Sequence, residues 1–112
     1  MDKLVKYRQY IKDILEEFSR IKPANGEIDS ELIFDDKNDR YLLMHIGWLG
    51  GQRIHSTVFH LDIIDEQIWI QCNNTELVLK QELVSLGVPE KDIVIGIQPP
   101  SVRKMLALEN AA

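Results

Sequence analysis

Hydrophobic residues near the N-terminus recur at alternating spacings of three and four, which predicts an amphipathic helix. The positions on this stripe are Leu4, Tyr7, Ile11, Ile14, Phe18 and Ile21. We expect the helix to end near Lys22, because Pro23 disfavours helical geometry in its predecessor and Asn25-Gly26 favours a turn. The spacing also fits a short coiled coil, but we favour packing of the stripe on the rest of the chain.

The pattern then changes to short runs rich in β-formers, separated by turn residues, which predicts four strands. We place them at 27–35, 41–49, 52–64 and 67–72. Gly50-Gly51 suits a two-residue hairpin turn because such turns need positive φ, and Asp65-Glu66 is a weaker match. These turns set two registers: Leu49 opposite Gln52, and Ile64 opposite Gln67.

These registers give the predicted sheet two different faces. The face expected to pack against the first helix carries Leu32, Phe34, Leu42, Met44, Ile46, Trp48, Thr57, Phe59, Leu61, Ile63, Ile68 and Ile70. The second face mixes apolar Ile33, Tyr41, Leu43, Ile54, Val58 and Trp69 with polar Glu31, His45, Ser56, His60, Asp62, Gln67 and Gln71. An apolar share of this size indicates contact with another molecule. A slip of one residue in either hairpin would exchange the faces.

The remaining sequence predicts a second helix, a short strand and a final helix. Asn73 and Glu76 have capping-box spacing before a leucine-rich run that ends at Gly87. Residues 92–97 predict a fifth strand, and Pro99-Pro100 precedes a helix to about residue 108. The fold class is therefore α+β: an N-terminal helix, a four-stranded antiparallel β-meander, a second helix, a short fifth strand and a C-terminal helix. We expect one domain over residues 1–112.

Composition narrows the class of protein. No run approaches the roughly 20 apolar residues that span a bilayer, and the N-terminus lacks the features of a signal peptide. Cys72 is the only cysteine, so no internal disulfide forms, and we expect a cytoplasmic protein without membrane attachment.

Charge is distributed unevenly along the chain. Residues 1–22 carry six basic and four acidic side chains, whereas residues 23–66 carry three basic and nine acidic ones. Because phosphate contacts dominate affinity for nucleic acids, the acidic sheet favours a protein partner over DNA. Direct DNA binding remains an alternative for the first helix, through Lys3, Lys6, Arg8, Lys12, Arg20 and Lys22.

His60 and Asp62 are two positions apart on one strand and share a face, an arrangement that orients a general base or a metal ligand. The register places Tyr41 and Gln71 opposite His60, and Glu31 opposite His45. A metal-dependent nuclease or hydrolase is thus an alternative function, although no motif spacing supplies a third ligand. The acidic segment 35–39 lacks the glycine and distal glutamate of a calcium loop and predicts a turn.

Several segments, in this order, resemble the XisI family of excision controlling factors for the fdxN DNA element, known chiefly from cyanobacteria. They are Leu4-x-x-Tyr7, His45-Ile46-Gly47-Trp48, His60-Leu61-Asp62-Ile63, Ile68-Trp69-Ile70-Gln71, Glu82-Leu83, Leu86-Gly87-Val88-Pro89, Asp92-Ile93-Val94 and Pro99 before Arg103-Lys104. The resemblance covers nearly the whole chain. One departure is Asp65-Glu66, where the family commonly has an Asp-Gly turn.

The resemblance implies a small α+β protein that assists a site-specific recombinase during programmed DNA rearrangement, alongside a second factor, XisH. No catalytic residues are carried over from the family. We therefore predict a non-enzymatic control factor, without cofactor or metal, that forms a homodimer or binds an XisH-like protein or the recombinase. The predicted interface residues on the second face are Tyr41, Leu43, Val58, His60 and Trp69.

Overall fold

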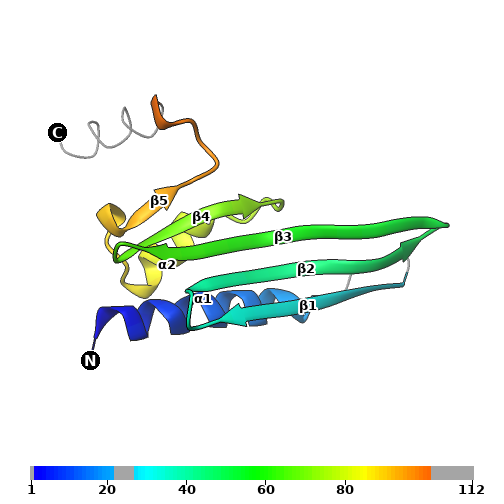
Figure 1. Ribbon diagram of the computed structural model, residues 1–112, viewed down its shortest axis with the longest axis horizontal. Helices are drawn as coiled ribbons and strands as arrows, with labels where there is room; N and C mark the ends of the chain where they lie inside the picture. Colours follow the sequence, from blue (N-terminus) through cyan, green and yellow to red (C-terminus); the bar gives the residue numbers. More distant parts are fainter. Residues whose placement is uncertain (1, 22–26, 102–112) are drawn as a thin grey trace.

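The computed structural model describes residues 2–21 and 27–101 of the 112-residue chain. In chain order its elements are α1 (Lys3–Ser19), β1 (Glu27–Asp35), β2 (Arg40–Leu49), β3 (Gln52–Ile64), β4 (Gln67–Asn73), α2 (Leu79–Leu86), the 3₁₀ turn η1 (Glu90–Asp92) and β5 (Ile93–Ile95) (Figure 1). The predicted α+β class and the four strands are confirmed. The predicted C-terminal helix lies largely outside the described residues.

The strands form one sheet in the order β1-β2-β3-β4-β5. The first four are antiparallel neighbours, whereas β5 runs parallel to β4. Parallel neighbours need a crossover connection, which α2 and η1 provide. The sheet is therefore mixed, and β1 and β5 form its two edges.

Both predicted hairpin turns are confirmed. Leu49 pairs with Gln52 and Ile64 pairs with Gln67, so each loop contains two residues. Gly50 and Gly51 have φ values of 55° and 82°, and Asp65 and Glu66 have φ values of 50° and 63°. The second turn thus adopts the same positive-φ geometry without glycine, at a conformational cost that glycine would avoid.

Two β-bulges change the pairing away from these turns. Met44 pairs with Thr57 but Leu43 pairs with Phe59, which leaves Val58 as an extra residue on β3. In the same way, Gln71 is extra on β4, because Leu61 pairs with Ile70 and His60 with Cys72. Each extra residue shifts the alternation of its strand by one position.

The first bulge makes much of the predicted face assignment wrong. We call the side of the sheet that faces α1 and α2 the inner face, and the opposite side the outer face. Tyr41, Leu43, His45, Ile54, Ser56 and Val58 belong to the inner side, although they were predicted on the second face. Leu42, Met44, Ile46, Trp48 and Thr57 lie on the outer face, although they were predicted in the core. The assignments of Phe59, Leu61, Ile63, Ile68 and Ile70 to the core are confirmed.

The core lies between the inner face and the two helices. Tyr41, Leu43, Phe59 and Leu61 are fully buried there. α1 contributes Tyr7, Ile11, Ile14 and Leu15, and α2 contributes Leu79 and Leu83. The Phe18 ring meets Phe59 edge-on, with 4.9 Å between centroids. Burying each such side chain stabilises the fold by roughly 1.5–3 kcal/mol.

Both helices are shorter than predicted. α1 ends at Ser19, and Ile21, placed on its apolar stripe from the sequence, is 61% exposed. α2 begins at Leu79 without a side-chain cap, because Asn73 instead accepts hydrogen bonds from the Thr75 amide and hydroxyl in the preceding turn. The predicted end of α2 is confirmed, since Gly87 caps it with a φ of 112°.

The molecule is elongated because its long strands extend past the helices. The radius of gyration is 15.3 Å, compared with about 13 Å expected for a compact chain of this length. Figure 1 shows the β2–β3 hairpin and the start of β1 projecting beyond the end of α1. None of the described helices is long and apolar enough to cross a membrane.

Candidate functional site

An apolar stripe follows β2 along the outer face. It consists of Leu42, Met44, Ile46 and Trp48, which alternate with the inner-face residues of the same strand. Trp48, at the projecting end, is 52% exposed, and the Arg53 guanidinium lies 5.4 Å from its ring centroid. Both described helices pack in the core on the inner side, so the described part of the chain places no helix over this stripe.

A polar cluster adjoins the stripe where β2, β3 and β4 run side by side. His60 Nε2 lies 2.7 Å from Asp62 Oδ1, and Arg40 Nε lies 3.6 Å from the same oxygen. The Gln71 amide donates to Asp62 Oδ2 at 3.3 Å. Asp62 is only 4% exposed, whereas the His60 and Arg40 side chains reach solvent. The carboxylate therefore links three strands and presents His60 and Arg40 at the surface.

This cluster differs in one respect from the predicted arrangement. His60 pairs with Leu42 and Cys72, not with Tyr41 and Gln71. Gln71 nevertheless reaches Asp62, because it is the bulged residue of β4. The prediction that His60 and Asp62 share a face is confirmed, and the structure adds the contact between them. The second bulge explains how Gln71 joins this pair.

The chemistry of this cluster favours a structural or contact role. Both oxygens of Asp62 already contact side chains of the chain itself. Among residues 2–21 and 27–101, no group of three or more His, Cys, Asp or Glu side chains is placed to hold a metal ion. Nothing in the described structure therefore adds the third ligand that the metal-dependent alternative requires.

The predicted pair of Glu31 and His45 is wrong. His45 pairs with Ser30 and lies on the inner side, whereas Glu31 pairs with Met44 and lies on the outer face. Residues directly opposite each other share a face, so these two side chains point away from each other. The cause is the bulge at Val58, which reverses the faces of β2 relative to the prediction.

The five predicted interface residues separate into two groups. Tyr41, Leu43 and Val58 belong to the hydrophobic core and are 0%, 0% and 5% exposed. His60 and Trp69 lie on the outer face, where Asp62 pairs with Trp69. The first three cannot contact a partner while the core is intact. For the other two an interface role stays a prediction.

A second buried carboxylate joins the two ends of the described chain. The Tyr7 hydroxyl donates to Asp92 Oδ2 at 2.5 Å, and Lys3 Nζ lies 3.5 Å from the same oxygen. Burial and, to a smaller extent, the hydrogen bond to Asp92 together raise the pKa of Tyr7 to about 12. Sequence reasoning missed this pair, although both residues belong to the segments that carry the family resemblance. It fixes α1 against the start of β5 on the inner side.

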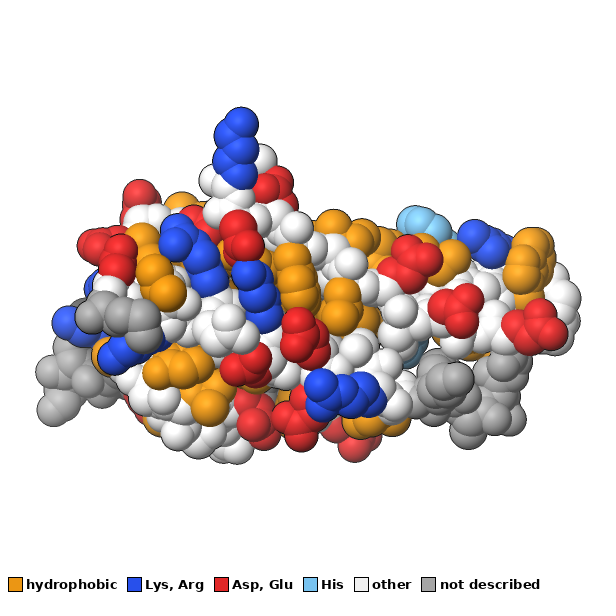
Figure 2. Space-filling view, turned by 90° about the horizontal axis from the view of Figure 1, so that it is seen from below, with side chains coloured by type: hydrophobic (Ala, Val, Ile, Leu, Met, Phe, Trp, Pro, Cys, Tyr) orange, Lys and Arg blue, Asp and Glu red, His pale blue; other side chains and the backbone are white. Residues whose placement is uncertain are grey.

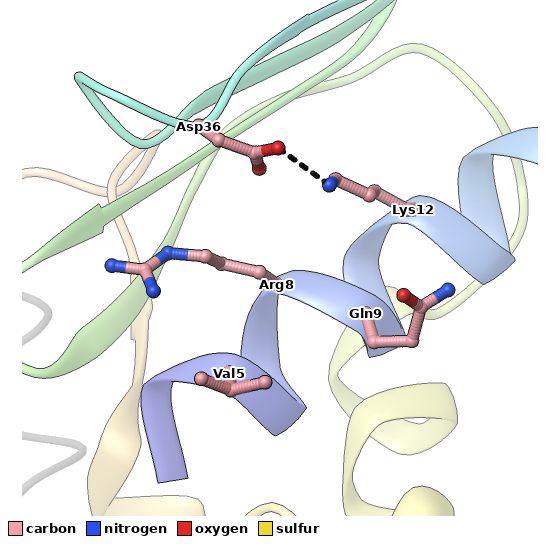
Figure 3. A pocket seen from close by; sticks show the side chains of 5 residues that line it. All are labelled: Val5, Arg8, Gln9, Lys12 and Asp36. Atoms are coloured by element: carbon pink, nitrogen blue, oxygen red, sulfur yellow. Dashed lines mark hydrogen bonds and ion pairs between the residues drawn. The ribbon is translucent and has the colours of Figure 1, made fainter. Parts of the chain in front are cut away.

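A third cluster lies where α1 meets the turn between β1 and β2. Arg8 Nε contacts Asp39 Oδ1 and Lys12 Nζ contacts Asp36 Oδ2, each at 2.7 Å. Figure 3 shows Lys12 reaching from α1 to Asp36 across a shallow pocket that Val5, Arg8 and Gln9 also line. The Lys12 contact is the main cause of the lowered pKa of Asp36.

This third cluster also holds a core residue of the inner face, Tyr41, in place. The Tyr41 hydroxyl donates to Asp36 Oδ1 at 2.8 Å, and burial raises the pKa of Tyr41 well above its ordinary value. The predicted turn over residues 35–39 is confirmed, because Asp35 accepts from the amides of Lys37 and Asn38.

Three of the six basic residues that the sequence offered for DNA contact are held by aspartates. Lys3, Arg8 and Lys12 are each paired with an aspartate, and Lys22 lies outside the described residues. Seen from the side of β1 and α1, blue and red side chains alternate instead of gathering by sign (Figure 2). This arrangement weakens the alternative of DNA binding through the first helix.

Comparison with known proteins agrees with this fold. The structure of a XisI-like protein from Anabaena variabilis ATCC 29413 superposes with a TM-score of 0.84 and 38% identity, over 91% of this chain and 94% of that one. The fdxN element excision controlling factor XisI from the same organism gives a TM-score of 0.80 and 32% identity, over 91% of this chain and 99% of that one. No curated protein matches.

The family comparison covers almost the whole sequence. The family model described as XisI protein matches residues 1–108. This range contains every segment on which the sequence resemblance was based, and both structural relatives exceed 30% identity. The chain belongs to the XisI family.

Proposed function

We propose that this protein is a non-enzymatic control factor for excision of a DNA element of the fdxN type, and that it acts by binding another protein. Its similarity to an fdxN element excision controlling factor over 91% of the chain supports the process. The proposed partner is an XisH-like protein or the site-specific recombinase. Binding to a second copy of the chain is the alternative use of the same surface.

The observation that carries this proposal is the apolar stripe on the outer face. Leu42, Met44 and Ile46 are only partly buried, and Trp48 is half exposed. Water-exposed apolar side chains in a continuous row are costly, and covering them with a partner recovers the hydrophobic free energy. Trp48 and Trp69 on the same face supply the large aromatic side chains that dominate many interfaces.

Two further observations support a protein partner and a non-enzymatic role. Outer-face positions of β1 are acidic, namely Glu27, Asp29 and Glu31, which disfavours contact with phosphates. The buried Asp62 has both oxygens engaged by side chains of its own chain, which favours a role in holding the sheet.

The proposal is tested by measuring affinity for purified XisH-like protein and recombinase by calorimetry. The test variant is Ile46→Asp, which places a charge in the middle of the stripe. The matched control is Val84→Asp, which adds the same charge at an apolar residue of α2 that is 39% exposed. We expect Ile46→Asp to weaken binding by at least about tenfold and Val84→Asp to leave it within about twofold.

The same two variants test whether excision of the element depends on the protein contact made by the stripe. An excision assay on a reporter that carries the element should lose activity with Ile46→Asp and retain it with Val84→Asp. Equal weakening by both variants, or a monomeric chain that binds neither protein at micromolar concentration, would contradict the proposal. Thermal unfolding of both variants checks that the loss does not come from misfolding.

A further inference from the structure

The edge of the sheet at β1 is a second surface, distinct from the outer face. β1 pairs with β2 on one side, and no described residue pairs with its other side. The pairing runs from Glu27 to Asp35 without a bulge. In such an edge strand, alternate N–H and C=O groups point outward and are available to another strand.

This edge lacks most of the devices that prevent strand addition. The strand reads Glu-Ile-Asp-Ser-Glu-Leu-Ile-Phe-Asp, with no lysine, proline or bulge. Leu32 and Ile33, which point to opposite faces, are 37% and 44% exposed. An added strand would therefore gain apolar contacts on both sides of the sheet.

Acidic side chains mark the outer-face side of this edge. Glu27, Asp29 and Glu31 occupy alternate positions, and none of them forms an ion pair with another described residue. Figure 2, seen from the β1 side, shows acidic side chains spread along this edge. A strand that binds the open backbone groups of β1 would therefore also need positive charge opposite this acidic row.

The charge pattern argues against a second copy of this strand. An antiparallel pair of β1 strands centred on Glu31 would set Glu31 opposite its own copy and Glu27 opposite Asp35. Like charges directly opposite each other destabilise a strand pair. A strand with lysine or arginine at alternate positions would instead meet opposite charges along the row.

We propose that the free edge of β1 binds an extended basic segment of a partner protein as an added strand. Backbone hydrogen bonds to β1 would hold the segment, as in other β-augmentation complexes. Its lysine or arginine side chains would face Glu27, Asp29 and Glu31, and its intervening apolar side chains would lie on the inner side near Leu32. The inference does not depend on the proposed role of the outer face.

The probe is a nine-residue peptide that alternates lysine and valine, titrated into the full chain by calorimetry and NMR. A control peptide of the same sequence is methylated on all peptide nitrogens, which keeps the charge and removes the N–H donors. We expect the unmodified peptide to bind and to slow amide exchange at alternate residues of β1. The methylated peptide should not bind.

Charge variants test the position of the peptide. Asp29→Lys/Glu31→Lys should weaken peptide binding by about tenfold, because two attractive pairs become repulsive. The matched control Glu17→Lys/Glu76→Lys makes the same charge change at exposed residues elsewhere and should leave binding within about twofold. The peptide titration uses neither the XisH-like protein nor the recombinase, so failure here is distinguishable from failure of the proposed function.

Four results would overturn the proposal. Equal binding of the methylated peptide would mean that charge alone is responsible. Equal weakening by both pairs of charge variants would show that the peptide does not bind at β1. No binding at millimolar peptide would show that β1 offers no such site. A chain dimer that Asp29→Lys/Glu31→Lys dissociates in sedimentation experiments would make a second copy the occupant.

Discussion

The hydrophobic residues 41–44 of β2 alternate between two faces of the sheet that differ in their environment. Tyr41 and Leu43 on the inner face are fully buried under the helices, whereas Leu42 and Met44 on the outer face are only partly buried. Hydrophobicity alone therefore does not distinguish a core residue from a contact residue on this strand. The distinction comes from which face the helices cover, so inner-face changes should reduce stability and outer-face changes should reduce binding.

The polar pairs on the two sides repeat this contrast. Tyr7 and Asp92 meet in the covered interior, 85 positions apart in sequence, and join α1 to the end of the sheet. His60 and Asp62 are neighbours on one strand, and the His60 side chain is 31% exposed. The Tyr7–Asp92 pair holds the N-terminal helix against the last strand of the sheet. The His60–Asp62 pair adjoins the surface that we propose for a partner.

The largest expected contrast is between Leu43→Ala and Leu42→Ala. Leu43→Ala opens a cavity in the core and should lower the free energy of unfolding by about 2–5 kcal/mol. Leu42→Ala removes a partly exposed side chain and should cost less than about 1.5 kcal/mol. Urea unfolding of both variants measures the difference. Similar losses would show that the outer face is also covered.

Gly47→Ala should also be strongly destabilising, although it adds only one methyl group. A Cβ at Gly47 would lie 1.9 Å from the Glu27 carbonyl oxygen and 2.7 Å from the Ile28 Cα. Both are backbone atoms, so β1 must move away, and we expect a loss of roughly 1–3 kcal/mol. Faster amide exchange confined to the start of β1 would locate the effect. An unchanged exchange pattern would contradict it.

Tyr7→Phe should cost about 1–3 kcal/mol, because the buried Asp92 loses a hydrogen-bond donor. The stability that the Tyr7 hydroxyl contributes is lost at high pH, when the hydroxyl loses its proton. The pKa of Tyr7 is raised from 10.0 to about 12, so its contribution is complete below pH 10 and is lost as pH rises through 12.

An alkaline titration checks this contribution. The stability difference between the parent chain and Tyr7→Phe should be constant at neutral pH and should decrease between pH 10 and 12. The absorbance of tyrosinate should show one group fewer titrating near pH 12 in the variant. A difference that stays constant to pH 12 would mean that the hydroxyl does not contact Asp92.

His60→Gln is expected to have the smallest effect on stability, below about 1 kcal/mol, because the His60 side chain is 31% exposed and Asp62 keeps its contacts with Arg40 and Gln71. Thermal unfolding near neutral pH measures it. The variant should reduce partner affinity more than it reduces stability. A loss of stability as large as that of Tyr7→Phe would place the pair among the structural contacts.

The sequence predicted the strands well because the turns between them have distinct chemistry. Gly50-Gly51 fixed one hairpin, and the two-residue spacing of Asp65-Glu66 fixed the other even without glycine. The end of α2 was predictable for the same reason, since Gly87 supplies the positive φ of its cap.

The faces of β2 were not predictable, because nothing in the sequence marks Val58 as a bulge. One extra residue reverses every side chain beyond it, so Tyr41 and Leu43 moved from the predicted interface to the core. The Tyr7–Asp92 contact was also missed, since no local pattern relates residues this far apart.

The central claim is that the outer face binds a protein partner. Both tryptophans of the chain, Trp48 and Trp69, lie on this face. Fluorine NMR of the chain labelled with 5-fluorotryptophan, titrated with unlabelled XisH-like protein or recombinase, therefore reports on it directly. We predict that both resonances shift or broaden when the complex forms. A complex that forms by sedimentation while both resonances remain unchanged would contradict the claim.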